Sequence, residues 1–231
     1  EKLVRAALGP GMSDTLVEQL IVRADGNAFY LEELIRATAA GRHEALPDSV
    51  IGMVQARLDA EGPQARRVLR AASVFGERFS QAGVAALLGG ESELAHVGEW
   101  LELLSTRELV ARAARAERRG SILDVEYTFT HALVREAAYA MLTHDDRVLG
   151  HRLAGAWFES VGSSSDAMAL AEHFRRGEEP ARAVRWYERA AAQALKANDL
   201  SAAIERAELG LSCGAAGETL GALRFIQAEG H

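Results

Sequence analysis

Residues 122–129 read ILDVEYTF and depart most clearly from the helical periodicity of this chain. Apolar and polar side chains alternate along the stretch, and a period of two residues is typical of a half-buried β-strand. A shorter alternating stretch, LVARA, occupies residues 109–113. The polar residues 115–121 between them are suited to a hairpin tip. The sequence therefore predicts one β-hairpin in a chain that otherwise indicates helix.

Residues 1–45, far upstream of this hairpin, indicate two or three helices. Ser13 or Asp14 can cap one of them. Gly26 ends that helix, and Asn27 tolerates the unusual backbone angles of the corner that follows. The next helix then starts with its free amides exposed, and such a start can meet an anion or the rim of a nucleotide. A plain helix–helix corner is the alternative.

Residues 48–106 hold four short helical patterns, and residues 131–162 return to helix. Ser80 and Ser92 are placed to cap the third and fourth of the short helices. Helices packed beside one β-hairpin are the layout of a winged helix. The predicted fold class is therefore mainly α, with an N-terminal helical segment and a winged-helix domain that contains one β-hairpin.

Four successive antiparallel helices are predicted after this domain, at about 166–177, 181–197, 199–213 and 216–229. The run Gly162-Ser163-Ser164-Ser165 marks a subdomain joint before them. Helices of this length with short turns are what a helical-hairpin solenoid needs. The match to a tetratricopeptide repeat (TPR) is partial: small residues fall on Ala203, Ala207 and Gly210 and the large aromatic on Tyr187, whereas Ala190 and Ala194 replace larger residues. Because such repeats need about three copies, we expect the array to continue beyond His231.

The composition is that of an ordinary globular protein. Hydrophobic residues make up 48% and charged residues 26% of the chain, which argues against disorder. The net charge of −7 is spread evenly, without the basic segment that phosphate binding usually leaves. No apolar run approaches the ~18–20 residues of a membrane span, so we expect a soluble, cytoplasmic protein. The chain opens on Glu1 without an initiator Met, and we interpret it as a piece of a longer protein.

Signals for catalysis and metal binding are poor. The sequence contains no GxxxxGK[ST], HExxH, GxSxG or CxxC motif. Cys213 cannot form an internal disulfide and lacks the basic flanks that a reactive thiol needs. His144, Asp145 and Asp146 are better interpreted as loop residues than as metal ligands. Glu32 and Glu33 point about 100° apart on a helix, so they do not converge, and we expect both to face water. We predict no catalytic residue and no metal site.

DNA contact is the serious alternative for a winged helix, whose second helix would enter the major groove. Here that helix is best assigned to residues 92–106. Residues 91–106 carry four glutamates and no lysine or arginine, so insertion would set carboxylates against a polyanion. The arginines of the hairpin, Arg112, Arg115, Arg118 and Arg119, are more simply a solvated surface. We therefore expect no DNA contact.

The order of several segments resembles one family. Residues 26–34, GNAFYLEEL, are similar to the GNPFFLEEL segment of bacterial signal-transduction ATPases with numerous domains, the STAND class. Residues 46–58, which begin LPDSV, and residues 67–76, RVLRAASVFG, are similar to the helices that follow it in the family. YTFTHALVREAAY at residues 127–139 also resembles the family. The TPR-like helices complete the order, so the resemblance covers nearly the whole chain.

The resemblance implies that a P-loop AAA-type domain lies upstream. Residues 1–45 would then be its helical lid, residues 46–162 its winged-helix domain and residues 163–231 the start of a TPR-like array. ATP or ADP with Mg²⁺ would be a cofactor of the parent protein, and this segment alone would hold none. The parent would often be linked to a Ser/Thr kinase, nucleotide cyclase or transcription-activator domain.

The resemblance also points to residues that sense the nucleotide. A Gly-x-Pro motif of the family lid packs against the base, and it maps to Gly26, Asn27 and Ala28, where Ala28 replaces the proline. A winged-helix histidine that reaches the ADP phosphate in related switches maps to His131. A polar helix start is the alternative interpretation of His131.

The function expected from all of this is a non-catalytic regulatory and interaction segment of a signalling ATPase. Its partners would be the upstream P-loop domain and a protein or small-molecule ligand on the array, in a groove with Arg182, Trp186 and Tyr187. A free-standing TPR-like scaffold and a DNA-binding winged-helix regulator are the alternatives. No membrane partner is expected.

Overall fold

The computed structural model describes residues 1–9, 12–41, 49–113, 117–119, 122–162 and 166–230. Within these residues the chain is mainly α, as predicted, with thirteen α-helices and one three-stranded antiparallel sheet. It divides into two compact units, Glu1–Arg66 and Arg67–His231. The domain boundaries expected near residues 45 and 162 stay predictions, and the serines 163–165 of the expected joint lie outside the described residues.

The first unit is built on helices α1 (Lys2–Leu8), α2 (Asp14–Ala24), α3 (Ala28–Ala39) and α4 (Val50–Asp59). Apolar side chains from all four helices meet in one core, among them Val4, Leu20, Leu34 and Met53. Ser13 caps α2 as predicted, because its Oγ accepts a hydrogen bond from the Leu16 N–H at 3.3 Å. The predicted helices of residues 1–45 are therefore confirmed, and they number three.

The corner between α2 and α3 differs from the prediction in one respect. Asp25 and Gly26 take left-handed backbone angles, with φ of 44° and 77°. Asn27 has an ordinary φ of −81° and caps α3, since its Oδ1 accepts a hydrogen bond from the Tyr30 N–H at 3.0 Å. The prediction that Asn27 tolerates unusual angles is therefore wrong, and the residue satisfies a free amide of the new helix instead.

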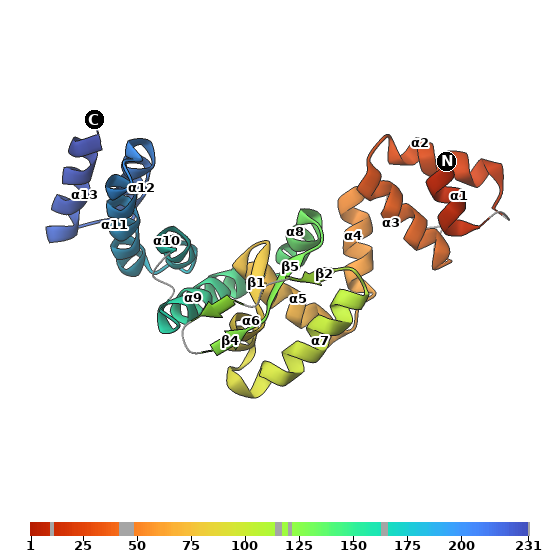
Figure 1. Ribbon diagram of the computed structural model, residues 1–231, viewed down its shortest axis with the longest axis horizontal. Helices are drawn as coiled ribbons and strands as arrows, with labels where there is room; N and C mark the ends of the chain where they lie inside the picture. Colours follow the sequence, from red (N-terminus) through yellow and green to blue (C-terminus); the bar gives the residue numbers. More distant parts are fainter. Residues whose placement is uncertain (10–11, 42–48, 114–116, 120–121, 163–165, 231) are drawn as a thin grey trace. The chain divides into compact units, whose positions relative to one another are not determined.

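The second unit contains the sheet (Figure 1). The chain runs through α5 (Pro63–Phe75), β1 (Arg78–Ser80), α6 (Gln81–Leu88), the short 3₁₀ helix η1 (Glu91–Glu93), α7 (Leu94–Thr106), β2 (Val110–Arg112), β3 (Glu117–Arg119), β4 (Ile122–Asp124) and β5 (Glu126–Phe129). The central strand β5 pairs antiparallel with β1 on one side and β2 on the other. Val110 lies opposite Phe129, and Arg78 lies opposite Thr128.

The predicted hairpin is confirmed only in part. Strands β2 and β5 pair as expected, but residues 117–119 of the expected tip form β3, which pairs with β4. Residues 115, 116, 120 and 121 lie outside the described part. The long stretch breaks at Val125, whose carbonyl accepts from the Gln81 N–H at 2.9 Å, while Asp124 Oδ1 accepts from the Ala82 N–H at 3.0 Å. Both acceptors satisfy the free amides of α6, so the strand is interrupted where it meets a helix start.

The two predicted serine caps have different outcomes. Ser80 caps α6 as predicted, with its Oγ accepting from the Gly83 N–H at 3.0 Å. Ser92 does not cap α7: it lies inside η1, and its Oγ donates to the Gly89 carbonyl at 3.5 Å. The extra 3₁₀ turn starts the helical path earlier than the sequence pattern indicated.

The remaining helices are α8 (Ala132–Ala140), α9 (His144–Ser160), α10 (Ala167–Arg176), α11 (Pro180–Lys196), α12 (Leu200–Ser212) and α13 (Gly217–Gly230). The last four confirm the predicted succession of helices, and each packs on the next (Figure 1). Glycines allow neighbouring helices to approach closely. A Cβ on Gly155 would lie 2.8 Å from the Phe174 ring, and one on Gly210 would lie 2.9 Å from Leu223.

Candidate functional site

The corner residues Gly26, Asn27 and Ala28 are all exposed in the first unit. They lie at the start of α3, where the Asn27 side chain accepts a hydrogen bond from the Tyr30 N–H. The aligned peptide dipoles of the helix give this end a partial positive charge. The corner can therefore receive an anionic or polar group, and its role in nucleotide sensing stays a prediction.

A buried ion pair fixes α3 beneath this corner. Glu33 is only 3% exposed and accepts a hydrogen bond from Arg57 of α4 at 2.5 Å. Arg36 lies 3.6 Å from the same carboxylate. The expectation that both Glu32 and Glu33 face water is therefore wrong for Glu33 and correct for Glu32. Burial of Glu33 is possible because α4 brings it a guanidinium group.

His131 lies in the second unit and is the N-cap of α8. Its Nδ1 accepts a hydrogen bond from the Leu133 N–H at 3.2 Å, so the ring proton of the neutral side chain is on Nε2. The structure thus confirms the polar helix start. Contact with a nucleotide phosphate stays a prediction, and Nε2 is the atom that would donate to it.

The three residues of the predicted partner groove do not share one surface. Arg182 and Trp186 both reach Glu159 of α9: the Arg182 guanidinium pairs with it, and Trp186 Nε1 donates to it at 2.6 Å. Arg182 also lies over the Phe174 ring, 3.9 Å from the centroid. Tyr187 instead is fully buried, and its hydroxyl donates to Glu172 of α10. Its position in the core corrects the expectation that it lines a groove.

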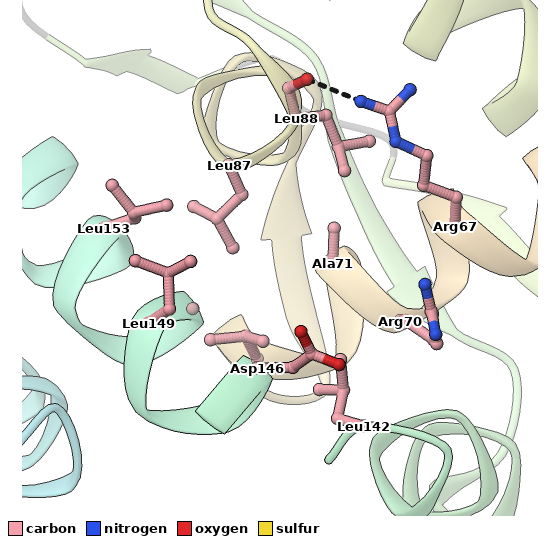
Figure 2. A pocket seen from close by; sticks show the side chains of 11 residues that line it. Arg67, Arg70, Ala71, Leu87, Leu88, Leu142, Asp146, Leu149 and Leu153 are labelled. Carbon is pink, nitrogen blue, oxygen red and sulfur yellow. Dashed lines mark hydrogen bonds between the residues drawn. The ribbon is translucent and has the colours of Figure 1, made fainter. Parts of the chain in front are cut away.

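A groove lined by leucines and by Arg67, Arg70 and Asp146 lies between α5, α6 and α9, with a volume of about 240 Å³ (Figure 2). Leu149 and Leu153 of α9 line one side and are 52% and 37% exposed. Leu87 of α6 lines the facing side, and the Arg67 guanidinium donates to the Leu88 carbonyl at 2.7 Å. Exposed apolar side chains gathered in a depression are typical of a contact surface.

A chain of three polar side chains, the half-buried Tyr139 and the buried His151 and His173, was missed by the sequence reasoning. The Tyr139 hydroxyl lies 2.8 Å from Nε2 of His151, and Nδ1 of His151 lies 3.0 Å from Nδ1 of His173. Burial, followed by the charges of His173, Arg176 and Arg135, lowers the pKa of His151 to about 3. Burial and then Arg176 lower the pKa of His173 to about 4. Both imidazoles are therefore neutral near pH 7.

Cys213 and His144, which the sequence analysis rejected as a reactive thiol and a metal ligand, lie in different parts of the second unit. Burial raises the pKa of the Cys213 thiol, which lowers its thiolate fraction. His144 contacts Glu178 at 3.5 Å and belongs to the exposed first turn of α9, so the prediction that residues 144–146 form a loop is wrong. Across the described residues, no three His, Cys, Asp or Glu side chains gather as a metal site. Nor does any described helix combine the length and apolar character needed to cross a bilayer.

Comparisons with protein-family models, with curated proteins and with solved structures each gave no match to this chain.

Proposed function

We propose that this chain is a non-catalytic regulatory segment of a multidomain signal-transduction ATPase of the STAND class. The observation that carries the proposal is the order of its parts. A small helical bundle with an exposed corner at Gly26 comes first, and a three-stranded sheet among short helices follows. A succession of antiparallel helices completes the order. In the proposal these are the lid, the winged helix and the start of a TPR-like array.

In this proposal, ADP held between an upstream P-loop domain, the lid and the winged helix stabilises a closed state. A ligand on the array, or exchange for ATP, shifts the population to an open state. Hydrolysis would need the P-loop lysine and the Mg²⁺ ligands of the upstream domain. The segment itself supplies contacts, with the exposed groove of Leu149 and Leu153 as a surface suited to them. A cytoplasmic location follows from this role.

Two alternative functions make different use of the same parts. A free-standing scaffold would use the array alone, and its gene would start near Glu1. A DNA-binding regulator would present α7 to the major groove, yet Glu99 and Glu102 on that helix are 78% and 56% exposed. Carboxylates on the presented face oppose binding to a polyanion, so this observation favours the nucleotide switch over DNA binding.

The test is a calorimetric titration of ADP with Mg²⁺ into the full-length protein and its His131→Asn variant. Asn keeps the helix cap of α8 but removes the ring nitrogen that would reach the phosphate. We expect ADP affinity to fall about tenfold or more in the variant, as for loss of a hydrogen bond to a charged group. Equal affinities would exclude His131 from the nucleotide site. A gene without an upstream P-loop would contradict the proposal as a whole.

A further inference from the structure

A cavity of about 380 Å³ lies where the end of α5 meets α8, α9 and α10. Its lining carries an unusual share of groups that donate hydrogen bonds or bear positive charge, namely Arg135, His151, His173 and Arg176. The two histidines are 3% and 7% exposed, so they form its inner wall. This volume is at the small end of the range for ligand pockets.

The hydrogen-bonded chain of Tyr139, His151 and His173 sets which atom of His173 faces this cavity. The Tyr139 hydroxyl can donate at one end of the chain. If Tyr139 donates to Nε2 of His151, then His151 donates through Nδ1 to Nδ1 of His173. His173 then carries its own proton on Nε2, which has no partner among the described residues.

Arg135 and Arg176 are each held in place by one hydrogen bond from the Nε atom. Arg135 Nε donates to the Ser73 carbonyl at 3.2 Å, and Arg176 Nε contacts Glu172 at 3.4 Å. Their terminal nitrogens have no hydrogen-bond partner in the part of the chain that the structure describes. The guanidinium groups are therefore positioned by the fold, and their forked ends remain available to an oxygen-bearing ligand.

The carboxylates around the cavity offset only part of this charge, because Glu172 pairs with Arg176 and not with Arg135. Burial opposes ionisation of Glu172, but hydrogen bonds from Arg175 and Tyr187 outweigh it and lower its pKa to about 2. Glu172 itself lines the cavity, and it is shared among Tyr187, Arg175 and Arg176, whose Nε contacts it at 3.4 Å. Glu77 stands exposed at the rim, and Asp166 acts on His173 by charge alone.

We propose that this cavity binds a small anion, through a carboxylate or phosphate group held by His173 Nε2, Arg135 and Arg176. The site does not depend on the proposed nucleotide switch, because none of its residues belongs to that switch. Burial and then the charge of Arg176 keep His173 neutral, and an anion between the guanidinium groups offsets the second of these effects. Anion and proton therefore bind together, so affinity rises as the pH falls from about 7 to 5.

The test follows the histidine side-chain resonances of ¹⁵N-labelled chain 1–231 during titration with inorganic phosphate or acetate, against chloride at equal ionic strength. A saturable shift of His173 with either anion is the expected result, and the two arms tell phosphate from carboxylate. Arg135→Gln and Arg176→Gln should each raise the Kd about tenfold or more. The matched control Arg185→Gln, an exposed position on α11 outside the cavity, should leave it unchanged.

Tyr139→Phe keeps the ring and removes the hydroxyl that polarises the chain, so it should weaken binding while the fold is retained. No saturable His173 shift up to about 50 mM of either anion, far above a millimolar Kd, would overturn the proposal. An unchanged Kd in both cavity arginine variants would overturn it as well, since the anion would then bind elsewhere.

Discussion

Replacement of Glu33 by alanine should destabilise the first helical unit far more than replacement of a water-facing glutamate, which the sequence indicated it to be. Glu33 is 3% exposed, and Arg57, its partner at 2.5 Å, is 14% exposed. Burial lowers the pKa of Arg57, against the effect of the Glu33 charge, so the carboxylate compensates a desolvated cation. Breaking a buried pair from one side costs about 3–5 kcal/mol. Because water reaches part of Arg57, we expect about 2–3 kcal/mol.

Hydrogen exchange of the α3 and α4 amides measures this loss of stability directly. A loss of about 2–3 kcal/mol accelerates exchange of amides that open with the unit by about 30- to 150-fold. The matched control is Glu32→Ala, an adjacent exposed position that should change stability by less than about 0.5 kcal/mol. The double variant Glu33→Leu with Arg57→Met should recover most of the loss. Equal exchange rates in the two single variants would refute the reasoning.

Three further predictions concern packing, acid and the helix corner. Gly155→Ala should cost about 1–3 kcal/mol by clash at α10, whereas Gly221→Ala, with open space around it, should be neutral or stabilising in thermal melts. Because burial lowers the pKa values of His151 to about 3 and His173 to about 4, the unfolded chain binds protons that the folded chain does not. The free energy of unfolding, measured by urea titration, should therefore be constant above about pH 7. It should fall between pH 6.5 and 4 by up to about 1.4 kcal/mol per pH unit per histidine, and a flat profile would contradict this. Ala28→Pro should be tolerated or add up to about 1 kcal/mol, since it is the first residue of α3 and follows extended backbone, and a large loss of melting temperature would show otherwise.

The sequence was sufficient to predict where most helices lie, but not which distant segments they contact. Helical spacing located the last four helices because each buries one face against a neighbour along the chain. The three residues of β1 were missed because so short a strand shows no period, and it exists because β5 offers it an edge. The break at Val125 has a similar cause, because its carbonyl accepts a hydrogen bond from the first turn of α6, which is distant in the sequence.

The candidate sites show the same division. A helix cap is local, so the polar helix start at His131 could be read from the chain. The burial of Glu33 could not, because its partner lies 24 residues away on another helix. His151 and His173 are separated by 22 residues and meet only when α9 packs on α10. Tyr187 was expected in a groove but is buried in the core, because α10 packs over it and supplies Glu172 as the acceptor for its hydroxyl.

The most direct test of the account compares nucleotide binding and turnover by chain 1–231 with those of the full-length protein. We predict that the chain alone hydrolyses no ATP and binds ADP with a Kd weaker than about 1 mM, whereas the full-length protein binds ADP about a thousandfold more tightly. ATP turnover or micromolar ADP binding by the isolated chain would contradict the account, as would a full-length protein that binds no nucleotide.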